Sequence, residues 1–389
     1  MSFKQKTQIL PILILSQFAC TSLWFAGNAI VDDLALKTGL GTEIIGYVLS
    51  SVQLGFISGT LIFALLMIAD RNSPSKVFFL CALLAASCNF SLLTNEVSKG
   101  HLIVARFGTG FFLAGIYPVG MKIASDYYEN GLGKALGFLV GALVFGTSFP
   151  FLISGMTLGS NYELILKTTS ILALIGGFLI LLFVPNGPFR KQSKKLQLAA
   201  GLSLFKIANF RKAAFGYFGH MWELYAFWAF TPLAIKTYNT LENTSIFVSL
   251  WTFTIIALGG LSCILGGYFS EKIGSYKVAF FSLLISGIFC ILSPFIFQLP
   301  PVLFLIGWCL WGMAVTADSP QFSSLVANAI PAELKGTGLT LVNCIGFAIS
   351  ILSIQLLSYL IKDVAAVYLF VVLAIGPIFG LYHLKKKSS

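Results

Sequence analysis

Long apolar stretches separated by short polar loops make up most of the chain. Eight of these stretches carry no charge: Thr7–Val31, Ile44–Ala69, Val77–Asn95, Ala135–Tyr162, Thr168–Phe189, Asn243–Ser270, Gly336–Ile361 and Val364–Leu384. A helix that crosses a bilayer needs about 20 mainly apolar residues. We therefore interpret each stretch as one membrane-spanning helix.

Four further spans bring the predicted total to twelve. The apolar run Val278–Ala317 is about twice the length of one span, and Pro300 and Pro301 divide it in two, because proline removes a helical hydrogen-bond donor. Two other spans contain charges: His101–Ala124, with Arg106 and Lys122, and Ala213–Ile235, with Glu223.

Composition supports a membrane protein and excludes several other classes. Hydrophobic residues make up 57% of the 389 residues and charged residues only 10%, too few to cover the surface of a soluble globule. The net charge of +11 does not indicate a nucleic-acid partner, because the basic residues lie in short loops between spans. All seven cysteines lie in apolar runs without a CxxC or Cys/His cluster, so we expect neither disulfides nor a metal site.

The positive charges predict the orientation of the helices. Of the 25 lysines and arginines, Arg106 and Lys122 lie inside spans, and 18 lie in the loops of one side. The other side holds the remaining five, which are Lys37, Lys99, Lys167, Lys236 and Lys362. Positive loops stay in the cytoplasm. We therefore expect a multi-pass protein of a bacterial-type inner (plasma) membrane, with both termini in the cytoplasm.

The longest polar segment divides the chain into two sets of six spans. We predict an N-terminal half at residues 1–184, a basic cytoplasmic linker at 185–210 and a C-terminal half at 211–389. The basic run in this linker is expected to contact anionic lipid headgroups.

Two loops show that the halves arose by duplication. At an offset of 201 residues, Asp70, Arg71 and Lys76 correspond to Glu271, Lys272 and Lys277. An acid–base pair followed by another cation thus recurs in the matching cytoplasmic loop of each half. The list of residues predicted to act in conformational gating is therefore Asp70, Arg71, Lys76, Glu271, Lys272, Lys277 and, near the cytoplasmic end of its span, Asp318.

These loops resemble a signature of the major facilitator superfamily. The second copy fits through Gly267, Glu271, Lys272, Gly274 and Lys277, whereas the first has Leu66 and Ser73 where glycines are expected. Other family patterns are similar to Arg106-Phe107-Gly108-Thr109-Gly110 and to the set Gly137, Gly141, Gly146 and Pro150. The resemblance implies an all-α integral membrane fold of 6+6 helices in two pseudo-symmetric halves.

A closer resemblance is carried by two short segments. The segments 22–28 (SLWFAGN) and 219–225 (GHMWELY) are similar to members grouped with nitrate and cyanate porters. Nitrate porters hold their anion with an arginine in each of helices two and eight. The corresponding spans here, Ile44–Ala69 and Asn243–Ser270, contain no basic residue. Nitrate is therefore not the expected solute.

Charges inside the membrane are costly and mark functional sites. Glu223 lies near the middle of its span, where an apolar environment favours the protonated carboxyl, and His220 is one turn away on the same face. We predict that Glu223 carries a coupled proton and that His220 and Arg106 tune it, Arg106 through a salt bridge between the halves. The alternative is a static buried pair. For Lys122 we expect a side chain that extends to the cytoplasmic interface.

The family resemblance also implies which helices line the substrate cavity. Candidate cavity residues on those helices are Trp24, Asn28, Gln53, Tyr117, Tyr225, Trp251, Trp311 and Asn343. Each aromatic residue could equally serve packing or anchoring at the interface.

The leading hypothesis is a monomeric secondary transporter that works by alternating access. It would move a small polar organic solute, with anionic ones such as an amino acid, carboxylate or siderophore among the candidates, together with protons. The alternatives are a proton-driven efflux pump for drugs or metabolites and a non-transporting receptor. An enzyme is not expected, since the sequence contains no GxxxxGK[ST] loop, no HExxH motif and no Ser/His/Asp set. We predict no catalytic residue and no cofactor.

Overall fold

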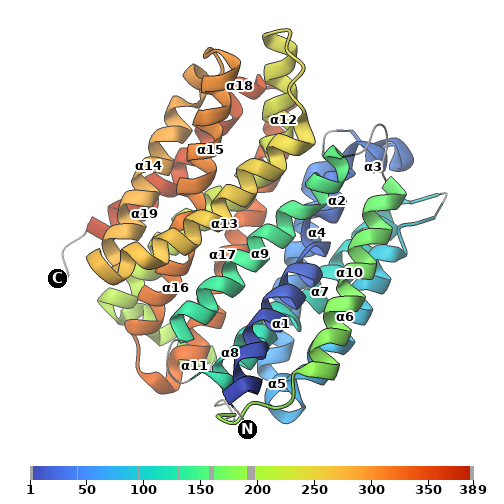
Figure 1. Ribbon diagram of the computed structural model, residues 1–389. Helices are drawn as coiled ribbons and strands as arrows, with labels where there is room; N and C mark the ends of the chain where they lie inside the picture. The colour runs from blue at the N-terminus through green and yellow to red at the C-terminus, as the bar shows by residue number, and fades with distance from the viewer. Residues whose placement is uncertain are drawn as a thin grey trace. The chain divides into compact units, whose positions relative to one another are not determined.

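A computed structural model describes residues 3–41, 43–94, 96–128, 132–156, 162–190 and 198–385. Helices and short connections make up this described part of the chain, and no strand occurs in it. The chain divides into two compact units, Met1–Lys195 and Leu196–Ser389, which we call unit 1 and unit 2 (Figure 1).

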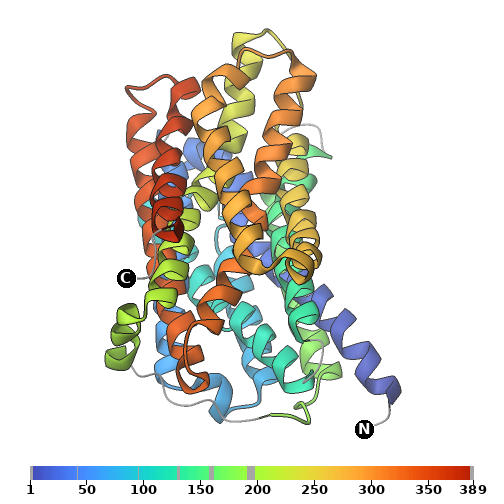
Figure 2. The ribbon, with the colours of Figure 1, turned by 90° about the vertical axis from the view of Figure 1, so that its left-hand side faces the viewer.

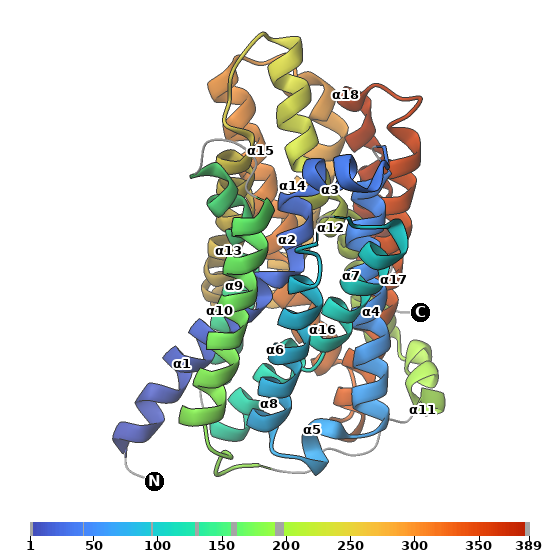
Figure 3. The same cartoon turned by 90° about the vertical axis from the view of Figure 1, so that its right-hand side faces the viewer.

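Unit 1 is a bundle of helices in which the spans lie side by side (Figure 3). Its helices are α1 (Phe3–Thr21), α2 (Leu23–Ala29), α3 (Val31–Thr38), α4 (Ile44–Leu65), α5 (Ile68–Arg71), α6 (Pro74–Phe90), α7 (Lys99–Leu113), α8 (Tyr117–Tyr127), α9 (Leu132–Gly155) and α10 (Tyr162–Phe183). The short helix α5 lies at the same end of this unit as the end of α8.

Unit 2 is a second helical bundle, coloured yellow to red in Figure 2. Its α-helices are α11 (Leu198–Ser203), α12 (Ala208–Leu241), α13 (Val248–Ile273), α14 (Ser275–Ile296), α15 (Pro301–Ala317), α16 (Ser319–Asn328), α17 (Lys335–Leu360), α18 (Ala366–Leu369) and α19 (Ile375–Lys385). Three short 3₁₀ helices complete it: η1 (Leu204–Lys206), η2 (Ala332–Leu334) and η3 (Phe370–Ala374).

Ten helical stretches among the described residues are long and apolar enough to cross a membrane. The other two predicted spans correspond to α6, a shorter apolar helix of 17 residues, and to the 34-residue α12. Helix α12 carries Arg211, Lys212, Glu223 and Lys236 within its length. The helix that holds the strongest candidate for proton coupling thus extends beyond its predicted span at both ends.

Several spans are interrupted within their length. Helix α1 gives way to α2 at Ser22, α7 to α8 at residues 114–116, and α15 to α16 at Asp318. Pro118 and Pro320 lie at the second position of α8 and α16, where proline is tolerated because no helical donor is needed there. These breaks place Ser22 and Asp318 at points where the regular helical hydrogen bonding stops.

Two predicted spans end earlier than expected. The span predicted at Ile44–Ala69 stops at Leu65, because Met67 adopts a left-handed conformation with φ 54° before the short α5 begins. Helix α10 ends at Phe183, since the following Pro185 and Pro188 cannot continue a helix. The split predicted at Pro300 and Pro301 is confirmed, with α14 ending at Ile296 and α15 beginning at Pro301.

Close helix packing in unit 1 depends on glycine. A Cβ added to Gly110 of α7 would overlap the carbonyl oxygen of Val52, and one added to Gly55 of α4 would overlap that of Phe107. Small residues let neighbouring membrane helices approach until their backbones touch. This contact fixes α4 against α7, which carries Arg106.

The predicted division at a basic linker, residues 185–210, remains a prediction. Residues 191–197, with Lys191, Lys194 and Lys195, lie outside the described part of the chain. The residues before this gap are well defined and belong to unit 1, as described below.

Candidate functional site

Arg106 is fully buried inside unit 1 and is bound by neutral acceptors. Its Nη2 donates to the carbonyl oxygen of Trp24 at 2.5 Å, and its Nη1 donates to that of Leu23 at 3.2 Å and to Asn89 Oδ1 at 3.4 Å. Leu23 and Trp24 directly follow the break at Ser22. The guanidinium group therefore joins α7 to the start of α2 and to α6.

Asn89 is held as firmly as the arginine that it contacts. Its Nδ2 lies within hydrogen-bond distance of the carbonyl oxygen of Leu166 (3.3 Å), Thr169 Oγ1 (3.1 Å) and Ser170 Oγ (3.0 Å), all on α10. The sequence analysis missed Asn89, although an amide inside an otherwise apolar run was a visible signal. Arg106 and Asn89 together form a polar node that connects α2, α6, α7 and α10.

Glu223 is the centre of a second polar node, inside unit 2, and is also fully buried. Its Oε1 accepts hydrogen bonds from Ser286 Oγ, from Trp311 Nε1 at 2.6 Å and from Cys290 Sγ at 3.2 Å. Ser286 and Cys290 lie on α14 and Trp311 on α15. Its Oε2 has no hydrogen-bond partner among the described residues. Three neutral donors therefore surround one carboxylate oxygen, and no lysine or arginine contributes.

His220 pairs with Asp318 rather than with Glu223. His220 Nδ1 lies 2.8 Å from Asp318 Oδ1, and both side chains are fully buried in unit 2. Asp318 lies at the junction of α15 and α16, and its predicted part in gating stays a prediction. Glu223 of α12 and Asp318, which contacts His220 of the same helix, are thus two separate buried acidic groups.

The two polar nodes are related by the 201-residue offset of the duplicated loops. Asn89 corresponds to Cys290, and Ser22, at the break between α1 and α2, corresponds to Glu223. Unit 1 thus has a cation from α7 facing the backbone beside Ser22, while unit 2 has an anion from α12 facing donors on α14 and α15. The offset thus pairs two positions of the nodes, whose buried charges differ in sign.

Arg106 and Glu223 each have their partners within their own unit. All hydrogen bonds described for the Arg106 guanidinium go to unit 1, and all those to the Glu223 carboxylate come from unit 2. Arg106 Nε and Glu223 Oε2 have no hydrogen-bond partner among the described residues, and the salt bridge between the halves stays a prediction. These contacts anchor the segment after Ser22, and the role of Arg106 in tuning the proton site stays a prediction.

The predicted gating residues of the two loops differ in their contacts. Lys122 Nζ lies 3.0 Å from Asp70 Oδ1 and 3.5 Å from Asp126 Oδ1. Asp70, Lys122 and Asp126 thus form an ion triad, and the contact of Lys122 with the loop residue Asp70 agrees with its expected extension to the interface. Glu271 is exposed and forms no ion pair within the described residues. The other predicted gating residues, Arg71, Lys76, Lys272 and Lys277, are exposed as well.

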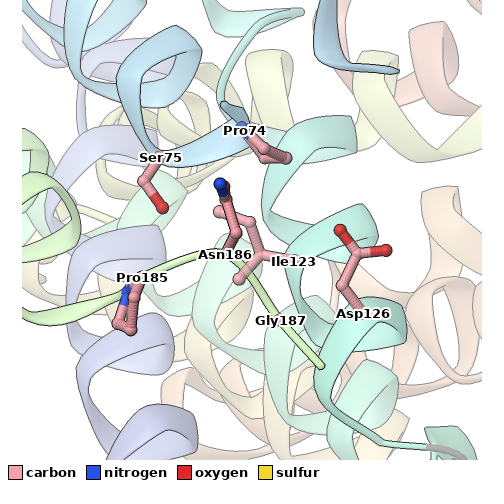
Figure 4. A pocket seen from close by; sticks show the side chains of 7 residues that line it. All are labelled: Pro74, Ser75, Ile123, Asp126, Pro185, Asn186 and Gly187. Atoms are coloured by element: carbon pink, nitrogen blue, oxygen red, sulfur yellow. The ribbon is translucent and has the colours of Figure 1, made fainter. Parts of the chain in front are cut away.

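The segment after α10 is bound to the same end of unit 1 as the ion triad. Arg190 Nη2 donates to the carbonyl oxygens of Asp70 (2.8 Å) and Asn72 (2.6 Å), and Ser75 Oγ donates to that of Val184 (2.5 Å). Figure 4 shows the small pocket at this junction, lined by Pro74, Ser75, Ile123, Asp126, Pro185, Asn186 and Gly187. The pocket belongs to this structural junction and offers no charged ligand site of its own.

Asp70 forms an ion pair, whereas Glu271 in the matching loop forms none within the described residues. This difference between the two loops gives a prediction for protein stability. We expect Asp70→Asn to lower the melting temperature of the purified protein by roughly 2–4 °C, since a partly buried ion pair contributes about 1 kcal/mol. Glu271→Gln should change it by less, because Glu271 has no ion-pair partner among the described residues. Neither variant should change solute affinity, since both loops lie outside the spans. Equal shifts for the two variants would contradict the asymmetry.

The candidate cavity residues lie in different environments. In unit 1, Trp24, Asn28 and Gln53 are buried and Tyr117 is half-buried. In unit 2, Trp311 binds Glu223, and Tyr225 packs against Trp228 and Phe347. Asn343 is half-buried. Trp251 lines an apolar hollow of about 340 Å³ between α13 and α15, together with Leu258, Val302, Leu305, Ile306, Cys309, Leu310 and Met313.

Comparison with known proteins identifies the fold. A sequence model of the Major Facilitator Superfamily matches residues 12–381. No curated protein matches the sequence. The structure is similar to that of the human organic anion transporter MFSD10 (TETRAN), with a TM-score of 0.71, 14% identity, and coverage of 98% of this chain and 99% of that one.

Two other solved structures show the same fold. The nucleoside transporter NupG has a TM-score of 0.72 and 16% identity, with 97% of this chain and 98% of that one covered. The proton:xylose symporter XylE has a TM-score of 0.75 and 12% identity, with 98% and 95% covered. These identities are low, so the similarity concerns the fold. The predicted all-α 6+6 fold is confirmed, and the relatives are transporters and not enzymes.

Proposed function

Because the chain belongs to the Major Facilitator Superfamily, we propose that it is a secondary transporter that couples the movement of a small polar organic solute to protons, and that Glu223 carries the coupled proton. In this proposal the protein lies in a plasma membrane with both termini in the cytoplasm. Proton-driven uptake moves the solute with the proton and proton-driven efflux exchanges the two, and in this proposal Glu223 carries the proton in either mode.

The observation that carries the proposal is the environment of Glu223. An ionised carboxylate buried in a membrane protein is unstable without a counter-charge or strong hydrogen bonds. Here Oε1 accepts three hydrogen bonds from neutral groups, while Oε2 has no described partner. This set of donors stabilises the ionised carboxylate only while Ser286, Cys290 and Trp311 remain in place. When these donors move away, a proton on the carboxylate is the simplest replacement for their hydrogen bonds.

Coupling then follows from helix movement within unit 2. The carboxylate lies on α12, but its donors lie on α14 and α15. A shift of α12 relative to these two helices would remove donors from Oε1 and favour the protonated form. A shift back would release the proton. Protonation would thereby be linked to the conformational state of the unit, as alternating access requires.

His220 and Asp318 provide a second titratable pair next to this site. His220 lies one helical turn before Glu223 on α12, and its Nε2 has no hydrogen-bond partner among the described residues. The His220–Asp318 pair carries no net charge when both groups are ionised, and +1 when Asp318 is neutralised. We assign it a part in delivering protons to Glu223.

Reconstituted protein tests the coupling. We expect a solute gradient imposed on proteoliposomes loaded with a pH-sensitive dye to change the internal pH, with xylose, uridine, benzoate and choline as the first solutes. The reason is that each transported solute molecule moves with, or against, a proton. Radiolabelled solute that enters the vesicles to equilibrium without any pH change would show an uncoupled carrier.

A further inference from the structure

Unit 1 contains four buried amide side chains, and their hydrogen bonding differs sharply. Asn89 donates to three acceptors on α10 and accepts from Arg106. Gln17, Asn28 and Gln53 are each at most 4% exposed. Both polar atoms of Gln17 and of Gln53, and Oδ1 of Asn28, have no hydrogen-bond partner among the described residues.

Such open amides are unusual in a folded protein. About nine-tenths or more of buried polar groups have a partner, and a buried group without one costs roughly 1–3 kcal/mol. Three amides in one unit therefore carry a substantial cost. A solute that hydrogen-bonds to them would offset that cost when it binds.

Two of the open amides lie beside the same aromatic contact. The rings of Trp24 and Phe56 are 4.8 Å apart, which sets α2 against α4. Asn28 is one helical turn after Trp24, and Gln53 is about one turn before Phe56. Because α4 runs antiparallel to α2, both steps lead in the same direction along the bundle. Asn28 and Gln53 therefore lie on neighbouring helices, on the same side of the Trp24–Phe56 contact.

A contact one turn further on confirms this alignment of α2 and α4. A Cβ added to Gly27 would come 2.8 Å from Val48 Cγ1. Gly27 adjoins Asn28, and Gln53 lies between Val48 and Phe56 along α4. The Trp24–Phe56 and Gly27–Val48 contacts thus enclose Gln53 on α4, and Asn28 directly follows the second contact on α2.

The charged groups described within the spans of unit 1 are already engaged. The two Nη groups of Arg106 donate to backbone carbonyls and Asn89. Its Nε has no hydrogen-bond partner among the described residues and is packed against Gly27, where an added Cβ would be only 3.0 Å away. Lys122 is held by Asp70 and Asp126. What unit 1 offers to a solute is therefore neutral hydrogen-bonding capacity next to an aromatic ring pair.

We infer that Asn28 and Gln53, beside Trp24, form a subsite for a neutral solute that carries hydroxyl or amide groups. This inference rests on the proposed transport function and specifies its substrate class. An amide oxygen accepts and an amide NH₂ donates, so a matching solute needs both donors and acceptors. Hydroxyl and amide groups supply both, whereas a carboxylate only accepts and an ammonium only donates. The anionic solutes considered from the sequence would need a free cation, which these contacts do not provide.

Equilibrium binding to the purified full-length protein tests this subsite. Thermal-shift titrations would use xylose, uridine and nicotinamide as neutral probes, benzoate and succinate as anions, and choline and putrescine as cations. We expect at least one neutral probe, and none of the charged probes, to stabilise the protein. The near-isosteric variants Asn28→Leu and Gln53→Met should each weaken that binding by about tenfold, because each removes one or two hydrogen bonds.

Stability in the absence of solute distinguishes a binding subsite from a structural one. Asn28→Leu and Gln53→Met should leave the melting temperature unchanged or raise it, since each replaces a buried polar group without a described partner. The matched control is Asn89→Leu, which should lower it, because that amide is fully bonded. The inference would be overturned if only charged probes, or no neutral probe, stabilised the protein. It would also be overturned if a neutral probe stabilised both variants and the wild type equally.

The experiment separates this inference from the proposed proton coupling. Binding at equilibrium needs no proton gradient, so it persists if the protein proves to be an uncoupled carrier. Glu223→Gln should accordingly keep the neutral-probe stabilisation while losing pH-driven transport. If the wild-type protein binds a neutral probe but shows no proton coupling, only the proposed function is overturned. If it shows proton coupling but binds no neutral probe, only the subsite is overturned.

Discussion

Replacement of Glu223 by glutamine is expected to abolish solute accumulation driven by a pH gradient while exchange between equal pools continues. Glutamine resembles the protonated carboxyl in shape and charge, and it can still accept hydrogen bonds from Ser286 and Trp311 through its oxygen. A gradient of one pH unit is worth about 1.4 kcal/mol per proton, which supports about tenfold accumulation at one proton per solute. The accumulation ratio should therefore fall from about tenfold to about 1.

The control for this variant is Glu242→Gln. Glu242 is exposed at the C-terminal end of the same helix, so the substitution removes the same charge without touching the buried node. Transport by Glu242→Gln should resemble that of the wild type. If Glu223→Gln still concentrates solute on a pH gradient, the carboxylate is structural and the proton is carried elsewhere, with His220–Asp318 as the next pair to test.

Arg106→Ala is expected to cause the largest loss of stability of any single substitution considered for unit 1. It removes the charged donor to the carbonyl oxygens of Leu23 and Trp24 and to Asn89, and hydrogen bonds to a charged group contribute about 1.5–3 kcal/mol each. A net loss of about 3–5 kcal/mol corresponds to roughly 6–20 °C in melting temperature. Thermal unfolding of the detergent-solubilised protein would measure it.

Two further variants give this prediction its specificity. Arg106→Lys keeps the charge but has no planar fork to reach two carbonyls, so it should recover only part of the stability. Val104→Ala, at a 70% exposed position of the same helix, should have little effect. An Arg106→Ala protein with wild-type stability and altered pH dependence would contradict the anchoring role and favour the predicted tuning of the proton site.

Residue pattern alone was sufficient to predict most of the fold. Spans in a bilayer must be long, apolar and helical, because backbone groups in lipid can only be satisfied within the segment. Prolines 300 and 301 likewise predicted a division that the structure confirms. The early ends at Leu65 and Phe183 differ in how predictable they were. The end at Leu65 depends on the left-handed backbone at Met67, which has no glycine to mark it, whereas Pro185 and Pro188 were a visible signal for the end at Phe183.

The sequence by itself determined which residues are costly to bury: Arg106, Glu223, His220 and Asp318 are unusual in an apolar chain wherever they lie. Only the tertiary structure decided their partners, because a pair depends on how helices rotate and where they break, and not on distance along the chain. Helical spacing suggested a pair between His220 and Glu223, three residues apart. The break at Asp318 instead gave the histidine a partner 98 positions away, and α14 and α15 supplied the donors to Glu223. The physical reason is that spacing restricts side chains on one helix to a common face, whereas packing determines which neighbouring helix meets that face.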